Sequence, residues 1–129
     1  MFEKKARARP LVLHVDDEKD IRELVAILLQ HFGVDVVSAE GAPEALALVR
    51  KDPPDLILLD INMPGVSGFE LCRQFKTDFK AIPILMVTAL TQFKDVEKAL
   101  AAGADGYVTK PFEPLKLKAK LAEHLAALR

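Results

Sequence analysis

Five short apolar runs, each followed by a segment with helical spacing, constrain the fold of this chain more than any other feature. Apolar runs of this length that lie between breaker residues are typical of strands buried on both faces of a parallel sheet. Right-handed crossovers then predict an α/β fold, a three-layer α/β/α sandwich around a five-stranded parallel sheet. The predicted strands are residues 11–15, 34–38, 56–59, 82–87 and 106–108.

Glycine, proline and capping residues predict where the helices begin and end. The first helix is expected over residues 19–31, and the second opens near residue 41 and ends before Pro53-Pro54. The third follows Gly65 with Ser67 as its N-cap, and the fourth runs from the N-cap Thr91 to Gly103. The fifth begins after Pro111. Apolar residues at helical spacing should face the sheet. In the last three helices these are Phe69, Cys72 and Phe75; Phe93, Val96 and Leu100; and Leu117, Leu121, Leu125 and Leu128.

The length and composition fit one globular domain. With 129 residues, half of them hydrophobic, the chain can bury a substantial core, and we expect that domain to span residues 11–129. Residues 1–10 carry the only basic run and are expected to form a solvated, mobile tail. A net charge of −1 gives no overall attraction to nucleic acid or to a membrane surface.

Cysteine content and hydropathy bear on the cellular compartment. The single cysteine, Cys72, excludes an intramolecular disulfide and fits a reducing environment. No apolar stretch approaches the length of a membrane span, and the charged N-terminus lacks the apolar segment of a signal peptide. We therefore expect a cytoplasmic protein. His14, His31 and His124 are widely separated, so they predict no metal cluster.

Three carboxylates and one ammonium follow the predicted strands. Asp16 and Asp17 follow the first strand, Asp60 the third and Lys110 the last. The carboxyl ends of parallel strands share one edge of the sheet, where ligands bind in a crevice. At separations near roughly 5 Å and an effective dielectric of about 20, each pair of ionised carboxylates repels by roughly 3 kcal/mol. Lys110 can supply one compensating charge, and Mg²⁺, which prefers oxygen ligands, can supply two.

Such a site suits the transfer of a phosphoryl group. Mg²⁺ is usually held by one or two carboxylates together with water and phosphate oxygens, which leaves the third carboxylate free to attack phosphorus. The residues alone leave open which aspartate is free. Asp60 is the geometric candidate, because it ends its strand singly while Asp16 and Asp17 form an adjacent pair suited to orienting the metal.

Short motifs around these residues occur in order along the chain. They are Asp16-Asp17-Glu18; Asp60 with Asn62-Met63-Pro64-Gly65 and Gly68; Thr88-Ala89; and Tyr107-Val108-Thr109-Lys110-Pro111-Phe112. Together they resemble the receiver domains of two-component response regulators, and the similarity extends from Leu11 to Leu128. Each motif alone is weak, whereas the ordered set is highly specific. The resemblance implies a flavodoxin-like (βα)5 fold with strand order 2-1-3-4-5 and a site at the switch point between the first and third strands.

The resemblance also implies roles for the acidic residues. Asp60 would accept a phosphoryl group from a phosphohistidine on a partner histidine kinase or histidine phosphotransfer protein. Asp17, Asp60 and the backbone carbonyl of Asn62 would bind Mg²⁺, for which Mn²⁺ can substitute, and Asp16 would act mainly through an intervening water. Such a domain promotes its own phosphorylation and dephosphorylation and is not an enzyme with a separate substrate.

A second set of residues would stabilise the phosphoryl group and transmit its presence. Thr88, Ala89 and Lys110 would neutralise and bind the phosphoryl oxygens. Movement of Thr88 would vacate space into which Tyr107 turns, changing the face built from the fourth helix, fifth strand and fifth helix. A downstream protein or an output domain would read this face. The Lys110–Pro111 bond is cis in the family.

Further partners are suggested by the fifth helix and by the end of the chain. The outward side of this helix carries Leu115, Ala119, Ala122 and Ala126, which can serve a homodimer or another partner, although isolated exposed alanines are common. The chain ends about where this helix ends, so we expect no output domain in it, and it is either a stand-alone receiver or a domain of a longer protein. It contains no DNA-binding motif.

Other classes of function compete with this interpretation. The fold could be a constitutive binding module, although the intact acidic residues argue against it, or an enzyme of phosphate esters, which would need a water-activating group and usually a cap. A nucleotide-binding domain is disfavoured because His14-Val15-Asp16-Asp17-Glu18 stands where a glycine-rich loop belongs. Taken singly, Asp17 could be a helix cap, Thr88 a strand residue, Lys110 a solvated charge and Tyr107 a packing residue.

Asn62 and Leu90 are expected to set the lifetime of the phosphorylated form. They lie two positions after Asp60 and Thr88 and would flank the path of the attacking water. Because leucine cannot orient water, we predict slower self-dephosphorylation in this protein than in a Leu90→Glu variant, measured as the decay of phosphorylated protein. Equal or slower decay in the variant would contradict the prediction.

Overall fold

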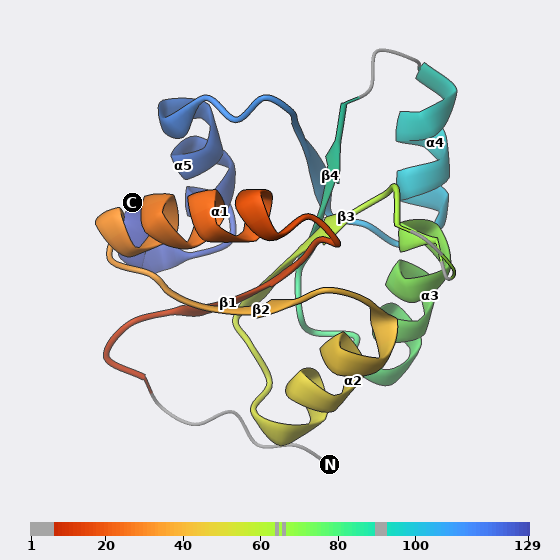
Figure 1. Cartoon of the computed structure of the whole chain (residues 1–129), viewed down its shortest axis with the longest axis horizontal. Helices are drawn as coiled ribbons and strands as arrows, with labels where there is room; N and C mark the ends of the chain where they lie inside the picture. The colour runs from red at the N-terminus through yellow and green to blue at the C-terminus, as the bar shows by residue number, and fades with distance from the viewer. Residues whose placement is uncertain (1–6, 64, 66, 90–92) are drawn as a thin grey trace.

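A parallel sheet of five strands runs through the middle of the molecule in the order β2-β1-β3-β4-β5 (Figure 1). The strands are β1 (Leu11–Val15), β2 (Asp35–Ala39), β3 (Leu56–Asp60), β4 (Ile84–Thr88) and β5 (Gly106–Thr109). The structure is a computed structural model that describes residues 7–63, 65, 67–89 and 93–129. Its strand order and parallel pairing confirm the predicted sheet.

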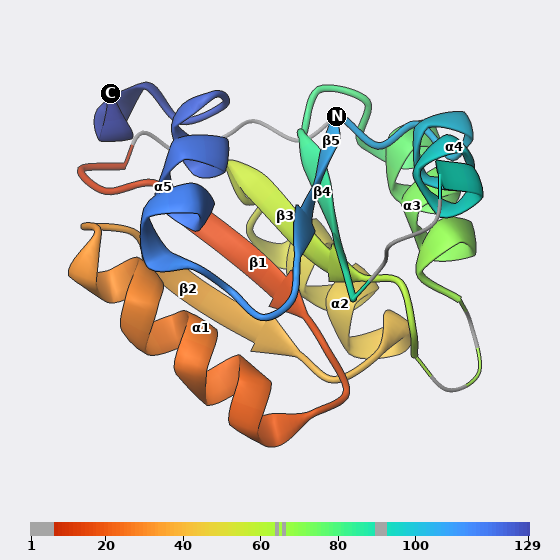
Figure 2. The same ribbon diagram turned by 90° about the horizontal axis from the view of Figure 1, so that it is seen from above.

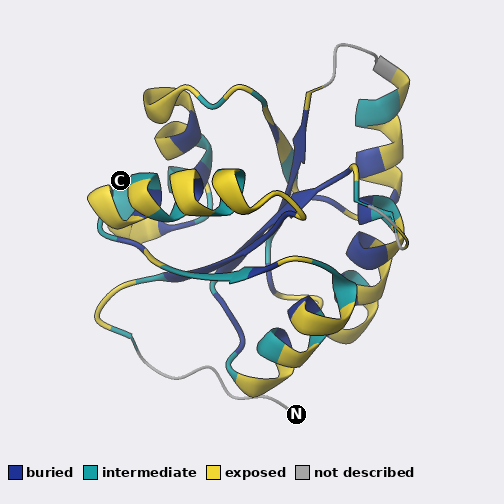
Figure 3. Cartoon of the chain, in the orientation of Figure 1, coloured by how far each residue is buried: buried dark blue, intermediate teal, exposed yellow. Residues whose placement is uncertain are grey.

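Helices cover both faces of the sheet, and the predicted three layers are confirmed (Figure 2). One face carries α1 (Lys19–His31) and α5 (Pro114–Ala122); the other carries α2 (Ala42–Lys51), α3 (Gly68–Asp78) and α4 (Phe93–Ala101). The central strands β1, β3 and β4 are buried along their whole length (Figure 3). Alternate residues of β1 pack on opposite faces, with Leu13 and Val15 in one core and Val12 in the other. Among the described helices, none is long and apolar enough to cross a membrane.

The start of β4 differs from the prediction for a reason of backbone chemistry. The strand begins at Ile84 instead of residue 82, because Pro83 has no N–H to donate to the ladder. The Pro83 carbonyl still accepts a hydrogen bond of 2.9 Å from the amide of Ile57. The first helix, by contrast, covers the predicted residues 19–31.

Helix α4 buries a different residue from the predicted one, and the fifth helix is shorter than expected. Leu100 was expected to face the sheet but is 56% exposed, because Ala99, one position before it, takes the buried side of α4. The fifth helix ends at Ala122, and a separate 3-10 turn at Ala126–Leu128 follows it. Leu125 is nevertheless buried. The side chain of Phe93 and the predicted N-cap Thr91 lie outside the described residues.

Cys72 lies on the buried face of α3, within the core. Burial raises the pKa of its thiol to about 11, so the group is neutral at physiological pH. A neutral, buried thiol behaves as a small apolar side chain, which is the role predicted from the sequence.

Arg7 connects the predicted N-terminal tail to the domain. Its guanidinium donates to Asp52 Oδ1 at 2.7 Å, to Asp55 Oδ2 at 3.2 Å and to the carbonyl of Pro53 at 2.7 Å. Asp55 Oδ2 also accepts the amide of Leu11 at 2.8 Å, so these contacts hold the beginning of β1 against that of β3. The side chain of Arg7 is only 15% exposed. The domain boundary at residue 10 and the mobility of the tail stay predictions.

Gly68 fixes how closely α3 approaches the end of β3. Its amide donates to the carbonyl of Ile61 at 3.1 Å, and Ser67 caps the helix by accepting the amide of Glu70 at 3.3 Å, as predicted. A Cβ atom at residue 68 would collide with the backbone carbonyl of Asp60 and lie 2.7 Å from the Cα of Ile61. Both neighbours are backbone atoms, so neither can yield without moving the end of β3.

We predict that Gly68→Ala lowers the free energy of unfolding by about 3 kcal/mol, the upper end of the usual cost of overpacking. The amide NMR resonances of Asp60 and Ile61 should shift with it, because their backbone has to move. The matched control is Gly33→Ala, where φ is +85° and no atom lies within 4 Å of an added Cβ, so strain alone should cost about 1–2 kcal/mol. Equal losses of unfolding free energy in the two variants, with the Asp60 and Ile61 resonances unchanged in Gly68→Ala, would contradict this account.

We predict that Arg7→Ala lowers the free energy of unfolding by about 1–3 kcal/mol, since it removes charge-assisted hydrogen bonds from a largely buried guanidinium. Arg9→Ala is the control: the Arg9–Asp35 pair is about half exposed and its loss should cost less than about 1 kcal/mol. Urea unfolding measures both. Equal, negligible losses would instead support a solvated tail over residues 1–10.

Candidate functional site

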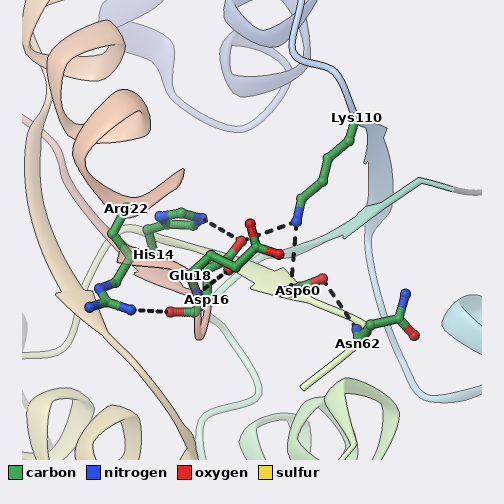
Figure 4. Close-up of polar contacts among 7 residues, drawn as sticks. All are labelled: His14, Asp16, Glu18, Arg22, Asp60, Asn62 and Lys110. Atoms are coloured by element: carbon green, nitrogen blue, oxygen red, sulfur yellow. Dashed lines mark hydrogen bonds and ion pairs between the residues drawn. The ribbon is translucent and has the colours of Figure 1, made fainter. Parts of the chain in front are cut away.

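The three predicted carboxylates meet at the carboxyl edge of the sheet. Asp16 and Asp17 follow β1 and Asp60 ends β3, which lies next to β1 in the sheet. One carboxylate oxygen from each lies within 4.8 Å of those of the other two. Asp16 and Asp60 are buried and Asp17 is exposed. Lys110 extends from the end of β5 into the same crevice (Figure 4).

Asp16 is held at both carboxylate oxygens. Its Oδ1 accepts the amide of Glu18 at 2.9 Å, and its Oδ2 lies 3.2 Å from the Nζ of Lys110. The guanidinium of Arg22 donates to the backbone carbonyl of Asp16 at 2.8 Å. The residue has no exposed surface. The helix that follows begins with Glu18 as N-cap and no side-chain cap bond, so the alternative of Asp17 as the cap of that helix is wrong.

The negative charge of Asp60 has weaker contacts with neighbouring donors than that of Asp16. Its Oδ1 accepts the amide of Asn62 at 3.2 Å, while its Oδ2 lies 3.7 Å from the Nζ of Lys110. Burial, first, and then the negative charge of Asp16 together raise the pKa of Asp60 to about 6. Lys110 and the Asn62 amide oppose this rise without cancelling it. The ionised form of Asp60 is therefore costly in the folded protein.

Lys110 carries the positive charge of the crevice. Burial would lower the pKa of its ammonium, but the charges of Asp60 and Asp16 outweigh this effect and raise it. The group is therefore protonated at physiological pH. It lies between the two buried carboxylates, 3.2 Å from Asp16 and 3.7 Å from Asp60.

The donor set fits a hard divalent cation. Carboxylate oxygens are ligands that Mg²⁺ prefers, and three of them lie close enough here to share one ion. The raised pKa of Asp60 agrees with this, because burial and the charge of Asp16 raise it and Lys110 offsets the rise only in part. A bound cation would oppose the rise further.

The predicted switch residues lie on or directly after β4 and on β5. Thr88, at the end of β4, is buried, and Ala89 after it is exposed. Tyr107 on β5 is 38% exposed, with the ammonium of Lys120 5.9 Å from its ring centre. The Lys110–Pro111 bond is cis, as the resemblance implied. Leu90 and Pro64 lie outside the described residues.

Sequence reasoning missed His14 as a neighbour of the site. It lies on β1 with no exposed surface, and its Nε2 is 3.9 Å from Asp16 Oδ2. Burial lowers the pKa of His14 to about 4 although Asp16 opposes the shift, so the ring is neutral at physiological pH. Residues two apart on a strand share a face, so its position two before Asp16 was a signal that the sequence contained.

A comparison with protein families decides what this arrangement is. The model for the response regulator receiver domain matches residues 12–122. This chain belongs to that family. Receiver domains are phosphorylation-controlled switches of two-component signalling, so the resemblance drawn from the motifs is confirmed.

Curated relatives agree with this assignment. The chain is 45% identical to the phosphate regulon transcriptional regulatory protein PhoB of Pseudomonas aeruginosa over 112 residues, covering 85% of this chain and 49% of PhoB. It is 40% identical to the DNA-binding response regulator MtrA of Mycolicibacterium smegmatis over 117 residues, covering 91% of this chain and 51% of MtrA. This receiver therefore spans about half the length of the curated relatives it matches.

Solved structures share the whole receiver fold. The chemotaxis protein CheY4 of Vibrio cholerae is 38% identical, with a TM-score of 0.87 that covers 92% of this chain and 100% of that one. The signal receiver domain of a signal transduction histidine kinase from Syntrophus aciditrophicus is 30% identical, with a TM-score of 0.83 covering 93% of this chain and 92% of that one. The likeness confirms the flavodoxin-like topology.

Without metal, Asp60→Asn should stabilise the receiver at pH 7.5. The folded-state pKa of Asp60 is raised from 3.8 to about 6, so wild type loses at most about 3 kcal/mol of stability as the pH rises through this range. The neutral amide escapes that loss. We expect urea unfolding in EDTA to show a gain of about 1–3 kcal/mol at pH 7.5 that disappears below about pH 4.

Glu97→Gln removes an exposed carboxylate from α4 and serves as the control, with little change expected at either pH. An Asp60→Asn variant no more stable than wild type at pH 7.5 would show that the crevice is not short of positive charge.

Proposed function

We propose that Asp60 accepts a phosphoryl group from a phosphohistidine on a partner histidine kinase or histidine phosphotransfer protein. The observation that carries this proposal is the gathering of three carboxylates and Lys110 in one crevice at the carboxyl edge of the sheet. Repulsion among the carboxylates opposes folding, so the arrangement favours a ligand that brings positive charge. A divalent cation meets that requirement and would also offset the negative charge of an incoming phosphoryl group.

Asp60 is the best nucleophile of the three aspartates. Asp16 is held at both oxygens, by the Glu18 amide and by Lys110, whereas Asp60 has a longer contact with the same ammonium. Attack by an Asp60 oxygen forms an O–P bond while the P–N bond of the phosphohistidine breaks, and the imidazole leaves with the electron pair. The attacking oxygen loses its charge in the product, while the phosphoryl oxygens bring a charge of about −2 that Lys110 and a bound cation would neutralise.

Mg²⁺, with Mn²⁺ as a substitute, would be held by Asp16, Asp17, Asp60 and the backbone carbonyl of Asn62. When bound, the ion supplies charge neutralisation for the carboxylates and for the phosphoryl oxygens. The exposure of Asp17 supports this assignment, because one edge of the cluster stays open to an entering ion and phosphoryl donor. The backbone amide of Asn62 donates to Asp60 Oδ1 at 3.2 Å and so orients that carboxylate.

Lys110, Thr88 and the backbone at Ala89 would bind the phosphoryl oxygens. Lys110 needs to move only from a shared position between Asp16 and Asp60 towards Asp60. Thr88 ends β4, the neighbour of β3 in the sheet, so its hydroxyl is at the right edge. Preorganised donors of this kind stabilise the charge of a transferring phosphoryl group.

Tyr107 would report phosphorylation to the surface. In this structure its ring is partly exposed beside Lys120 of α5. Movement of Thr88 towards the phosphoryl group would let the ring turn inward and change the surface of α4, β5 and α5. The phosphoryl group shifts this equilibrium only by its differential interaction with the two states.

The output of the switch would be protein contact. Because the chain covers about half of PhoB and MtrA but all of CheY4, both an attached output domain and a separate downstream protein suit it. Leu100 on α4 and Leu115 on α5 are 56% and 82% exposed, which supports a partner or a second copy binding there. We further propose that this domain itself contacts neither nucleic acid nor membrane and acts in the cytoplasm, whose reducing conditions suit the buried Cys72 thiol.

The single tyrosine and absence of tryptophan give a direct test of the switch. Adding Mg²⁺ with beryllofluoride, an acyl phosphate mimic, should reduce iodide quenching of Tyr107 fluorescence in wild type and leave Asp60→Asn unchanged. Thr88→Ala should still bind the mimic, seen by ¹⁹F NMR, without the change in quenching. Binding of the mimic to Asp60→Asn, or no response in wild type, would overturn the proposed function.

A further inference from the structure

His14 is a buried polar residue that the proposed reaction does not use. Within the described part of the chain, neither nitrogen of its ring has a hydrogen-bond partner, and the residue has no exposed surface. An unsatisfied buried polar group costs about 1–3 kcal/mol. An aliphatic side chain like its neighbour Val12 would fill a core position without that cost. Packing alone therefore does not explain why a histidine occupies this position.

The carboxylate that Lys110 holds also lies close to this ring. His14 Nε2 lies 3.9 Å from Asp16 Oδ2, the same oxygen that lies 3.2 Å from Lys110 Nζ (Figure 4). A distance of 3.9 Å exceeds a normal N–H···O bond by about 1 Å and leaves no room for a bridging water. A small rotation of either side chain would make the bond.

Phosphorylation would create the need for that bond. A phosphoryl group on Asp60 brings a charge of about −2 to one side of Lys110, and this draws the ammonium away from Asp16. Asp16 has no exposed surface, so bulk solvent does not reach the carboxylate oxygen that Lys110 leaves. Among the described basic side chains, His14 is the other one within 4.0 Å of the Asp16 carboxylate.

We infer that His14 is a positioning residue whose Nε2–H donates to Asp16 Oδ2 when Lys110 turns to the phosphoryl group on Asp60. The ring stays neutral, and no proton is transferred. Asp16 thereby keeps its place in the crevice in both states of the switch. This inference rests on the proposed function, because it requires Lys110 to leave Asp16.

Nitrogen-15 NMR of the His14 ring in the whole chain tests the inference without any substitution. The spectrum is recorded with Mg²⁺ alone and again after addition of beryllofluoride. We expect the Nε2–H proton of His14 to move downfield on addition of beryllofluoride, as a new hydrogen bond to a carboxylate requires. The Lys110 and Asp60 signals, recorded in the same samples, report whether the mimic has bound.

Two variants separate hydrogen bonding from packing. His14→Leu keeps the bulk and removes the donor, so the affinity for beryllofluoride at saturating Mg²⁺ should fall about tenfold, the size expected for one hydrogen bond to a charged acceptor. His14→Gln keeps an N–H donor and should recover most of this loss. Affinity for Mg²⁺ alone should change less than about twofold in both, because Lys110 still pairs with Asp16 there.

The outcomes distinguish this inference from the function on which it rests. If the Asp60 and Lys110 signals of wild type do not change on addition of beryllofluoride, both the proposed function and this inference fail. If they respond while the His14 ring signal stays unchanged, the inference alone is overturned. Equal losses of Mg²⁺ and beryllofluoride affinity in His14→Leu would likewise assign the ring a packing role only.

Discussion

The balance between three carboxylates and one ammonium at one edge of the sheet is the constraint on which the rest of this receiver depends. Pairing of β1 with β3 brings Asp16, Asp17 and Asp60 together, and β5 delivers Lys110 from beyond β4. One ammonium cannot neutralise three carboxylates. Burial and the charge of Asp16 raise the pKa of Asp60 to about 6, and Lys110, which lies closer to Asp16, offsets this rise only in part.

This imbalance suits the proposed switch. Lys110 lies between two buried carboxylates at distances that differ by half an ångström, so the proposed phosphoryl group on Asp60 would draw it towards that side. The surrounding backbone is far less adaptable, since β3 is fully buried and Gly68 packs against its last residue without space for a methyl group. A rigid frame around a few movable charged groups would let the proposed switch begin in the crevice without displacing β3.

The sequence was sufficient for the topology and for the composition of the crevice. Largely apolar runs at β1, β3 and β4 indicate strands buried on both faces, and acidic residues at the ends of such strands lie at the carboxyl edge. It was less informative where a residue's environment depends on long-range packing. Leu100 and Ala99 are both apolar, and only the rotation of α4 against the sheet decides that Ala99 is buried.

Charged and polar residues that find distant partners were also beyond sequence reasoning. Arg7 binds Asp52 and Asp55, which are more than forty positions away along the chain, so its sequence context suggested a solvated tail. His14 was judged by its distance from other histidines, whereas its neighbour of interest is a carboxylate two residues on. In both cases the sequence did not show which partner the fold brings into contact with the side chain.

Covalent phosphorylation of Asp60 is the most direct test of the central claim. The protein would be incubated with Mg²⁺ and a phosphorylated histidine phosphotransfer protein or phosphoramidate, reduced with borohydride to mark the acyl phosphate, and mapped by mass spectrometry. The account predicts one modified residue, Asp60, in wild type and none when EDTA replaces Mg²⁺. Modification at another residue, or none under any of these conditions, would contradict it.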